Sequence, residues 1–283
     1  MKNQTYRYRP VRFYVTAFIF TWLFWFAAAY IVRHGGDEGT GMALMLLGLI
    51  VPSVTAMFTV LLSGSKALKR DLRNKLIGLF RVKPSNVIIS IAVFFVIIVV
   101  SILLSTLFGQ SLNQFAVADF SFSAGGSALL TIILAALFEE LGWRGYAEDS
   151  IAAYCSWVKE SVVFGLVWGL WHMPLFLIPD TYHYNILAQS PWFMVNFFVS
   201  VMPIGFLFTW VYVKNHRSIL ACMIFHFFVN FLQEKIAMTQ TTKCVETVVL
   251  FIAAAIVVAY NRDMFFETRH VGNLLGEKEK KIT

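Results

Sequence analysis

Charge is scarce in this sequence. Only 14% of its 283 residues are Asp, Glu, Lys or Arg, against about 25% in soluble domains. Apolar residues make up 58%, against about 45–50%, and Phe alone occurs 28 times. This composition excludes a soluble globular domain. Because no repeat, low-complexity linker or soluble segment interrupts the chain, we interpret residues 1–283 as a single integral membrane domain.

Cysteine is rare as well, and its placement excludes two kinds of site. The three cysteines are an odd number without the spacing of metal ligands, so they imply no disulfide framework: Cys155, Cys222 and Cys244. The HExxH pattern of the common zinc proteases is absent. The net charge of +7 gathers in short segments beside apolar runs, which indicates contact with anionic membrane lipid and not with nucleic acid.

Long apolar runs are what the sequence does contain. Runs of about 20 residues predict an all-α bundle of about eight transmembrane helices. Their expected ranges are 13–32, 42–62, 87–108, 127–146, 161 to 174 or 179, 192–213, 219–232 and 245–260, and a charged tail follows at about 261–283. Pro52 and Pro203 fall inside two of these runs and predict kinks.

Basic residues between Ser63 and Ser85 set the predicted orientation. Asp71 is the one acid in a segment that holds seven bases: Lys66, Lys69, Arg70, Arg73, Lys75, Arg81 and Lys83. An excess of Lys and Arg places a loop in the cytoplasm, and eight spans then put both termini there too. The apolar residues of the segment predict an amphipathic helix on the membrane surface.

Two carboxylates and an arginine end the fourth apolar run. Glu140 and Arg144 are four residues apart and share a helix face in the favourable order. Glu139 is turned about 100° away and cannot share the arginine equally. The spacing therefore predicts a supporting pair, Glu140 and Arg144, beside a free carboxylate, Glu139.

Histidines on two other predicted helices lie at a matching depth. By a rise of about 1.5 Å per residue, Glu139, His172 and His226 all fall within roughly 10 to 17 Å of the cytoplasmic face. Asn230 follows His226 by four residues and shares its face. We expect these four side chains to meet. The remaining histidines are interpreted as solvated: His34, His183, His216 and His270. A charged segment between the fourth and fifth runs is interpreted as an interfacial connector: Glu148, Asp149, Lys159 and Glu160.

This set of side chains suits hydrolysis. A carboxylate with a nearby histidine can take a proton from water and return it to a leaving amine, and His226 and Asn230 can donate hydrogen bonds to the oxyanion that forms. The same Glu139, His172 and His226 can instead hold a divalent metal such as zinc. We prefer direct acid–base use of water, with no metal or other cofactor.

Two other classes of protein stay open. An intramembrane Glu can carry protons in a coupled transporter, but no repeated half or pair of broken helices supports one here. A non-catalytic membrane protein can keep the fold and bind a peptide. A single buried His often serves only as a hydrogen-bonded strut between helices, whereas the combined set is hard to explain in that way.

Three ordered motifs resemble those of the CPBP group of intramembrane proteases. This group includes the CAAX prenyl-protein endoproteases of the Ras-converting type and bacteriocin-processing or self-immunity proteins. The EExxxR motif is present from Glu139 to Arg144, and the His-xxx-Asn motif from His226 to Asn230. The aromatic-xxx-His motif, usually written with Phe, has Trp168 before His172. The motif-bearing core spans about residues 127–231.

The resemblance implies a membrane endopeptidase whose cavity opens to the cytosol and the lipid. In that family the substrate is a prenylated cysteine near a protein C-terminus, and the three residues after it are removed. By likeness, Glu139 activates the water, His172 assists it, and His226 with Asn230 stabilises the oxyanion. A related immunity or bacteriocin-processing protein of the same fold is the alternative within the group.

Overall fold

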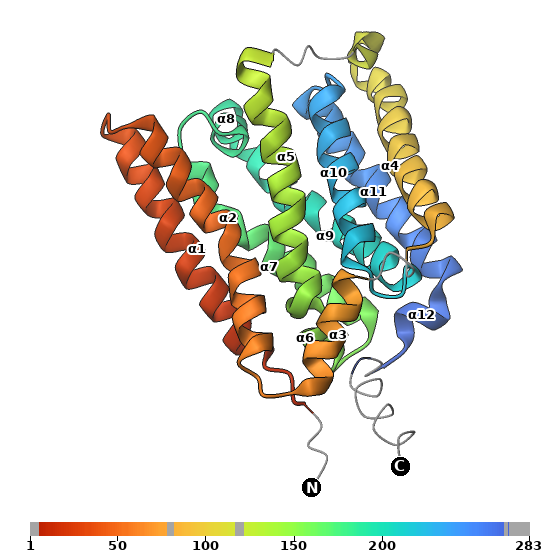
Figure 1. Ribbon diagram of the computed structural model, residues 1–283. Helices are drawn as coiled ribbons and strands as arrows, with labels where there is room; N and C mark the ends of the chain where they lie inside the picture. Colours follow the sequence, from red (N-terminus) through yellow and green to blue (C-terminus); the bar gives the residue numbers. More distant parts are fainter. Residues whose placement is uncertain (1–5, 78–81, 117–121, 269–270, 272–283) are drawn as a thin grey trace, which may run out of the picture.

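The protein is a bundle of helices, shown in Figure 1. The computed structural model describes residues 6–77, 82–116, 122–268 and 271. Within these residues the secondary structure is helical apart from isolated β-bridge residues, among them the pair Ser156 and Thr268. The long helices are α1 (Pro10–Arg33), α2 (Glu38–Leu61), α4 (Pro84–Ser105), α5 (Phe122–Gly142), α7 (Trp157–Trp171), α9 (Pro191–Lys214), α10 (Ile219–Lys235) and α11 (Gln240–Tyr260).

Shorter elements connect them. They are α3 (Lys66–Leu76), α6 (Glu148–Ala152), α8 (Tyr182–Gln189), α12 (Arg262–Phe266), the 3₁₀ turns Thr106–Phe108, Leu112–Phe115 and Met173–Leu177, and a π-helical turn, Trp143–Ala147, which we call the π-turn. The start of α1 and the short helices α3, α6 and α12 all lie at the lower end of the bundle in Figure 1.

Six helical segments of the described chain are long and apolar enough to cross a membrane. They are α1, α2, α4 with its 3₁₀ turn, α7 with its 3₁₀ turn, α9 and α11. The helices α5 and α10 are not among them, yet α5 packs against α2 and α10 within the same bundle (Figure 1). The prediction of an all-α polytopic membrane protein is confirmed.

Local sequence signals explain where the helices begin. Proline, whose missing N–H costs nothing in a first turn, opens α1, α4 and α9 at Pro10, Pro84 and Pro191. At the start of α10, Ser218 accepts a hydrogen bond from the backbone N–H of Ala221. At the start of α2, Asp37 accepts a hydrogen bond from the backbone N–H of Thr40. Hydrogen bonds from Thr40 lower the pKa of Asp37 below its ordinary value.

Helices α2 and α5 cross closely beside Glu139, and this crossing fixes where along the bundle the predicted site lies. A Cβ on Gly142 would lie 2.5 Å from the Cβ of Pro52, so only glycine fits there. One turn before Gly142 in α5, the carbonyl of Phe138 accepts a hydrogen bond from Ser53 of α2. Pro52 thus lies inside α2, at the point where α2 contacts the residues on either side of Glu139.

Helix α3 packs against other helices, whereas the sequence predicted that it lies on the membrane surface. Its apolar residues Leu68 and Leu72 are buried in the protein core, together with Asp71 and Lys75. It contacts α2, α10 and the π-turn. The amphipathic pattern is correctly identified, but the interpretation as a helix lying on the membrane surface is wrong for this face, which packs against protein.

The boundaries around the fourth and fifth spans also differ from those predicted. Regular α5 ends at Gly142 and continues as the π-turn, and α7 begins at Trp157, four residues before Ser161. The connector interpretation is correct only for Lys159, which is exposed, because its three acids are fully buried: Glu148, Asp149 and Glu160. His270 and most of the predicted tail, 261–283, lie outside the described residues.

Candidate active site

Glu139 is held by two tryptophans. Its Oε2 accepts hydrogen bonds from the indole Nε1 of Trp143, at 3.3 Å, and of Trp168, at 2.8 Å. The side chain is buried, and no cation of the described chain lies within ion-pair distance of it. A charge in this position is therefore stabilised by neutral donors alone. Glu139, Trp143, Trp168 and His172 together are called the indole site below.

His172 is placed at the C-terminal end of α7, where the helix passes into the 3₁₀ turn Met173–Leu177. Its Nδ1 lies 2.7 Å from the backbone carbonyl of Trp168. A carbonyl only accepts, so Nδ1 carries the proton and Nε2 of the neutral ring keeps its lone pair. The ring of Trp168 lies 5.8 Å from that of His172 and 5.9 Å from that of His226, and its N–H donates to Glu139. The predicted meeting of Glu139, His172 and His226 therefore takes place around Trp168.

Glu140 has charged neighbours, in contrast to Glu139. Both of its oxygens lie 3.0 Å from NH1 of Arg144, which confirms the predicted pair. Oε1 also lies 2.8 Å from Nδ1 of His226 on α10. The sequence did not predict this second contact. It joins α5 to α10 through one carboxylate.

His226 and Asn230 share one face of α10, as predicted. The ring of His226 meets Trp168 edge-on at 5.9 Å between centroids and Phe208 at 5.2 Å. Asn230 lies one turn farther along and is half-buried, and none of the described residues hydrogen-bonds to its side chain. Trp168 therefore lies beside all three predicted chemical groups: Glu139, His172 and His226.

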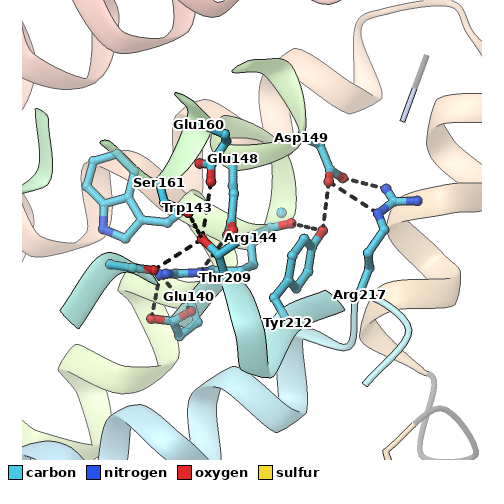
Figure 2. A network of polar contacts seen from close by, with 12 residues as sticks. Glu140, Trp143, Arg144, Glu148, Asp149, Glu160, Ser161, Thr209, Tyr212 and Arg217 are labelled. Atoms are coloured by element: carbon cyan, nitrogen blue, oxygen red, sulfur yellow. Dashed lines mark hydrogen bonds and ion pairs between the residues drawn. The ribbon is translucent and has the colours of Figure 1, made fainter. Parts of the chain in front are cut away.

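Arg144 organises a second group of buried acids, shown in Figure 2. Its Nε lies 2.9 Å from Oε2 of Glu148, an ion pair by distance whose N–H is not aimed at the oxygen. The guanidinium carbon lies 4.6 Å from the ring centre of Phe164 and 4.5 Å from that of Phe208, so cation–π contacts add to the pairing. Arg144, Glu140, Glu148, Glu160 and Thr209 are called the arginine cluster below.

One further acid, Glu160, completes this cluster. Glu160, at the start of α7, accepts a hydrogen bond of 3.2 Å from Thr209, which itself accepts one of 3.0 Å from Ser161 (Figure 2). Three buried carboxylates thus surround one guanidinium. Burial raises the pKa of Glu148, which lies in α6 beyond the span, to about 7; Arg144 opposes this shift and Asp149 adds to it.

The π-turn is held from below by side chains of other elements. Its widened turn leaves backbone carbonyls to be satisfied elsewhere. Lys75 of α3 donates to the carbonyls of Arg144, at 2.9 Å, and Gly145, at 2.8 Å, and Tyr212 of α9 donates to that of Arg144 at 3.1 Å. The sequence between Glu139 and Asp149 is therefore anchored by two distant segments.

Asp149 gathers the same partners. It lies 2.7 Å from Nζ of Lys75 and pairs with Arg217, which also pairs with Asp71. It also accepts a hydrogen bond from Tyr212 at 3.1 Å, and Figure 2 shows its contacts with Tyr212 and Arg217. Burial disfavours the charge of Asp149, but Arg217 and Lys75 outweigh it and hold the pKa below its ordinary value. Asp71, Lys75, Asp149, Tyr212 and Arg217 are called the basal lock below.

The described residues contain no group of three His, Cys, Asp or Glu side chains arranged to hold a metal ion. In the alternative set, Oε2 of Glu139 and Nδ1 of both His172 and His226 are already hydrogen-bonded. These hydrogen bonds leave Nε2 of each ring and Oε1 of Glu139 as the atoms that a ligand or a water can meet.

Comparison with known proteins agrees with the motifs. Residues 121–232 match the family described as type II CAAX prenyl endopeptidase Rce1-like. CAAX prenyl protease 2 of Methanococcus maripaludis is 40% identical over 265 residues, which cover 93% of this chain and 98% of that protein. The chain belongs to the Rce1-like CAAX prenyl endopeptidase family. It is a peptidase, and its apolar helices make it an integral membrane protein.

Several buried residues of this Rce1-like peptidase were not predicted from the sequence to belong to the site or its surroundings. The spacing Glu140, Arg144, Glu148 runs at four-residue intervals and was a visible signal for the second acid partner of the arginine. Glu160 and the basal lock gave no comparable signal, because they come from segments far apart in the chain. The two indole donors to Glu139 were also missed, because tryptophan in an apolar run is typically a lipid-facing or interfacial residue.

One of the four histidines interpreted as solvated proves to be packed. His183 of α8 stacks on the ring of His172 at 5.6 Å between centroids and meets Phe197 at 4.7 Å. Its Nε2 is buried without a hydrogen-bond partner among the described residues. The solvated interpretation is therefore wrong for His183. His34 and His216 are exposed, as expected.

Proposed function

We propose that this peptidase cleaves prenylated CAAX-type proteins after the lipidated cysteine and releases the C-terminal tripeptide. Support comes from the family, from the relative named CAAX prenyl protease 2, and from a polar site set among apolar helices. An isoprenoid chain can lie against such helices while the peptide bond reaches the polar residues. The partners implied are a prenylated protein or peptide and membrane lipid, with no nucleic acid.

Glu139 is the residue that we assign to water activation. The observation that carries this assignment is that Glu139 is a buried carboxylate held only by neutral donors beside His172. Glu139 takes a proton from water as the oxygen attacks the scissile carbonyl, and the C–N bond then breaks as the amine receives a proton. His172 assists through Nε2, because Nδ1 is fixed on the Trp168 carbonyl.

His226 and Asn230 are assigned to the oxyanion. Because Nδ1–H of His226 points to Glu140, the ring can also donate from Nε2 only when it carries both protons. The amide of Asn230 has donors that no described residue occupies, so it can supply a second hydrogen bond to the oxyanion.

The decisive experiment uses the purified protein with a farnesylated CAAX peptide, read by mass. Release of the tripeptide from this peptide, and not from its non-prenylated twin, supports the proposal. Glu139→Gln is the matched inactive control, since it keeps the shape of the side chain. Cleavage by that variant at the wild-type rate would refute the role of Glu139.

We further propose that the reaction needs no metal. Dialysis against a strong chelator should leave the rate unchanged, and added zinc should not increase it. A loss of activity that zinc restores would overturn this proposal and favour the metal alternative.

We also propose that the lower end of the bundle, with α3, faces the cytoplasm and that the site opens toward it. The excess of Lys and Arg in 63–85 supports this orientation. Single cysteines introduced at exposed positions of α3 should react with an impermeant thiol reagent only after the membrane is opened. Labelling from the outside of intact cells would reverse the orientation.

A further inference from the structure

We propose that Trp168 is a positioning residue that sets the pH range in which Glu139 works as a base, through its indole N–H. This inference rests on the proposed function of Glu139. The usual Phe of the aromatic-xxx-His motif would place a ring at the same point of α7 but would bring no donor. In this chain the N–H lies 2.8 Å from Oε2 of Glu139.

Both indole donors meet the same oxygen of Glu139. Oε2 accepts from Trp168 and Trp143, whereas Oε1 accepts from no described residue and is not closed off from solvent. Oε2 of the neighbouring Glu140, by contrast, is fully enclosed. The two indoles therefore hold Oε2 and leave Oε1 free to accept a proton.

A hydrogen bond to an ionised carboxylate favours the charged form over the protonated one. Glu139 has no cation to do this, so the two indole N–H groups are the donors that offset its burial. The bond from Trp168 is the shorter of the two and comes from another helix. We therefore assign it the larger share of the effect.

Trp168 also holds the histidine. Its backbone carbonyl fixes Nδ1 of His172 at 2.7 Å, while its side chain fixes Glu139. Trp168 thus positions both the base, Glu139, and its assisting histidine, His172. The backbone part of this arrangement survives any side-chain change at position 168, so a substitution there isolates the contribution of the N–H.

Trp171 offers a matched control three residues away on the same helix. Its ring is buried and lies 4.8 Å from the ring of His172, yet its indole N–H has no hydrogen-bond partner among the described residues. Changing Trp171 to Phe removes the same atoms from the same neighbourhood without removing a donor from Glu139. Any effect of ring size or packing is common to both variants.

The experiment compares pH profiles of kcat/KM for wild type, Trp168→Phe and Trp171→Phe. In Trp168→Phe the acid limb should move up by about one pH unit, because a hydrogen bond to a charged group contributes about that much, while the plateau at high pH stays near wild type. Trp171→Phe should leave the limb in place. Equal limbs in wild type and Trp168→Phe, or equal shifts in both variants, would overturn the proposal.

A second measurement does not depend on activity. Infrared difference spectra of the purified protein report the C=O stretch of a protonated carboxyl, and the band that disappears in Glu139→Gln belongs to Glu139. That band should persist to higher pH in Trp168→Phe than in wild type. If the band shifts but no variant cleaves the peptide, Trp168 keeps its role and the proposed function fails; an unshifted band rejects the role of Trp168.

Discussion

Glu139 and Glu140 are neighbours in sequence but lie in opposite surroundings. In the indole site, Glu139 meets two neutral N–H groups, whereas Glu140 in the arginine cluster meets a guanidinium and an imidazole. A carboxylate fixed by cations holds helices together and has little freedom to exchange protons. One fixed by neutral donors is held in place without an ion pair. In the proposed mechanism, the kind of partner, more than depth or burial, distinguishes the acid assigned to water activation from the acid assigned to support.

The largest expected effect is on the indole site. Glu139→Gln and His172→Ala should each reduce cleavage of a farnesylated peptide by at least about 10²–10⁴, the range of general acid–base catalysis. Neither change removes a charge partner of the arginine cluster, so the melting temperature should stay near wild type. Rates by mass spectrometry and thermal unfolding on the same preparations test both parts. Loss of folding in Glu139→Gln would mean that the two acids are assigned the wrong way round.

The arginine cluster should respond in the opposite manner. Arg144→Ala leaves several buried carboxylates without their cation and should lower the free energy of unfolding by about 3–5 kcal/mol, with activity falling as well. Removing Glu140 together with Arg144 should recover little stability, because Glu148 and Glu160 remain buried. Adding Glu148→Gln to Glu140→Gln and Arg144→Met should recover more. Thermal unfolding of the three variants ranks them, and full recovery by the double change would contradict the role of Glu148.

Asn230 sharpens the comparison at the oxyanion position. Asn230→Ala should lower kcat by about 10²–10³, as expected for one lost oxyanion donor, with little change in the melting temperature. His226→Ala should lower kcat similarly and also destabilise the protein, because it breaks the contact with Glu140. Steady-state kinetics and thermal unfolding separate the two. Equal melting temperatures for both variants would argue against the Glu140 contact.

The smallest expected effect is a pH dependence of stability from Glu148. Its pKa is raised from 4.5 to about 7 on folding, so the folded protein keeps a proton that the unfolded chain has lost. The stabilising contribution is therefore complete below the lower value and is lost as the pH rises through the higher one. Glu148→Gln should gain stability over wild type between roughly pH 5 and pH 8, by at most about 1.4 kcal/mol per pH unit. A constant difference across this range would contradict the raised pKa.

The sequence predicted the helical fold and brought Glu139, His172 and His226 together because helix rise and charge cost are local rules. The Glu140 to Arg144 pair was likewise readable from a four-residue spacing. The sequence could not predict whether α3 packs against protein or against lipid, because both present an apolar surface to Leu68 and Leu72. Glu148 and Glu160 looked like interfacial residues because acids near the end of an apolar run are usually solvated. What makes them structural is the position of Arg144, whose guanidinium lies against Phe164 of α7 and Phe208 of α9.

The basal lock has a consequence for biogenesis. The anchors of the π-turn and of Asp149, just after it, come from Lys75, early in the chain, and from Tyr212 and Arg217, late in it. A nascent chain that has inserted its helices only as far as α7 already contains Glu139, Trp168 and His172, but it lacks two of these anchors. The turn that follows Glu139 is therefore secured only once the connection between α9 and α10 has been made. Assembly of this kind delays the finished site until most of the bundle has been synthesised.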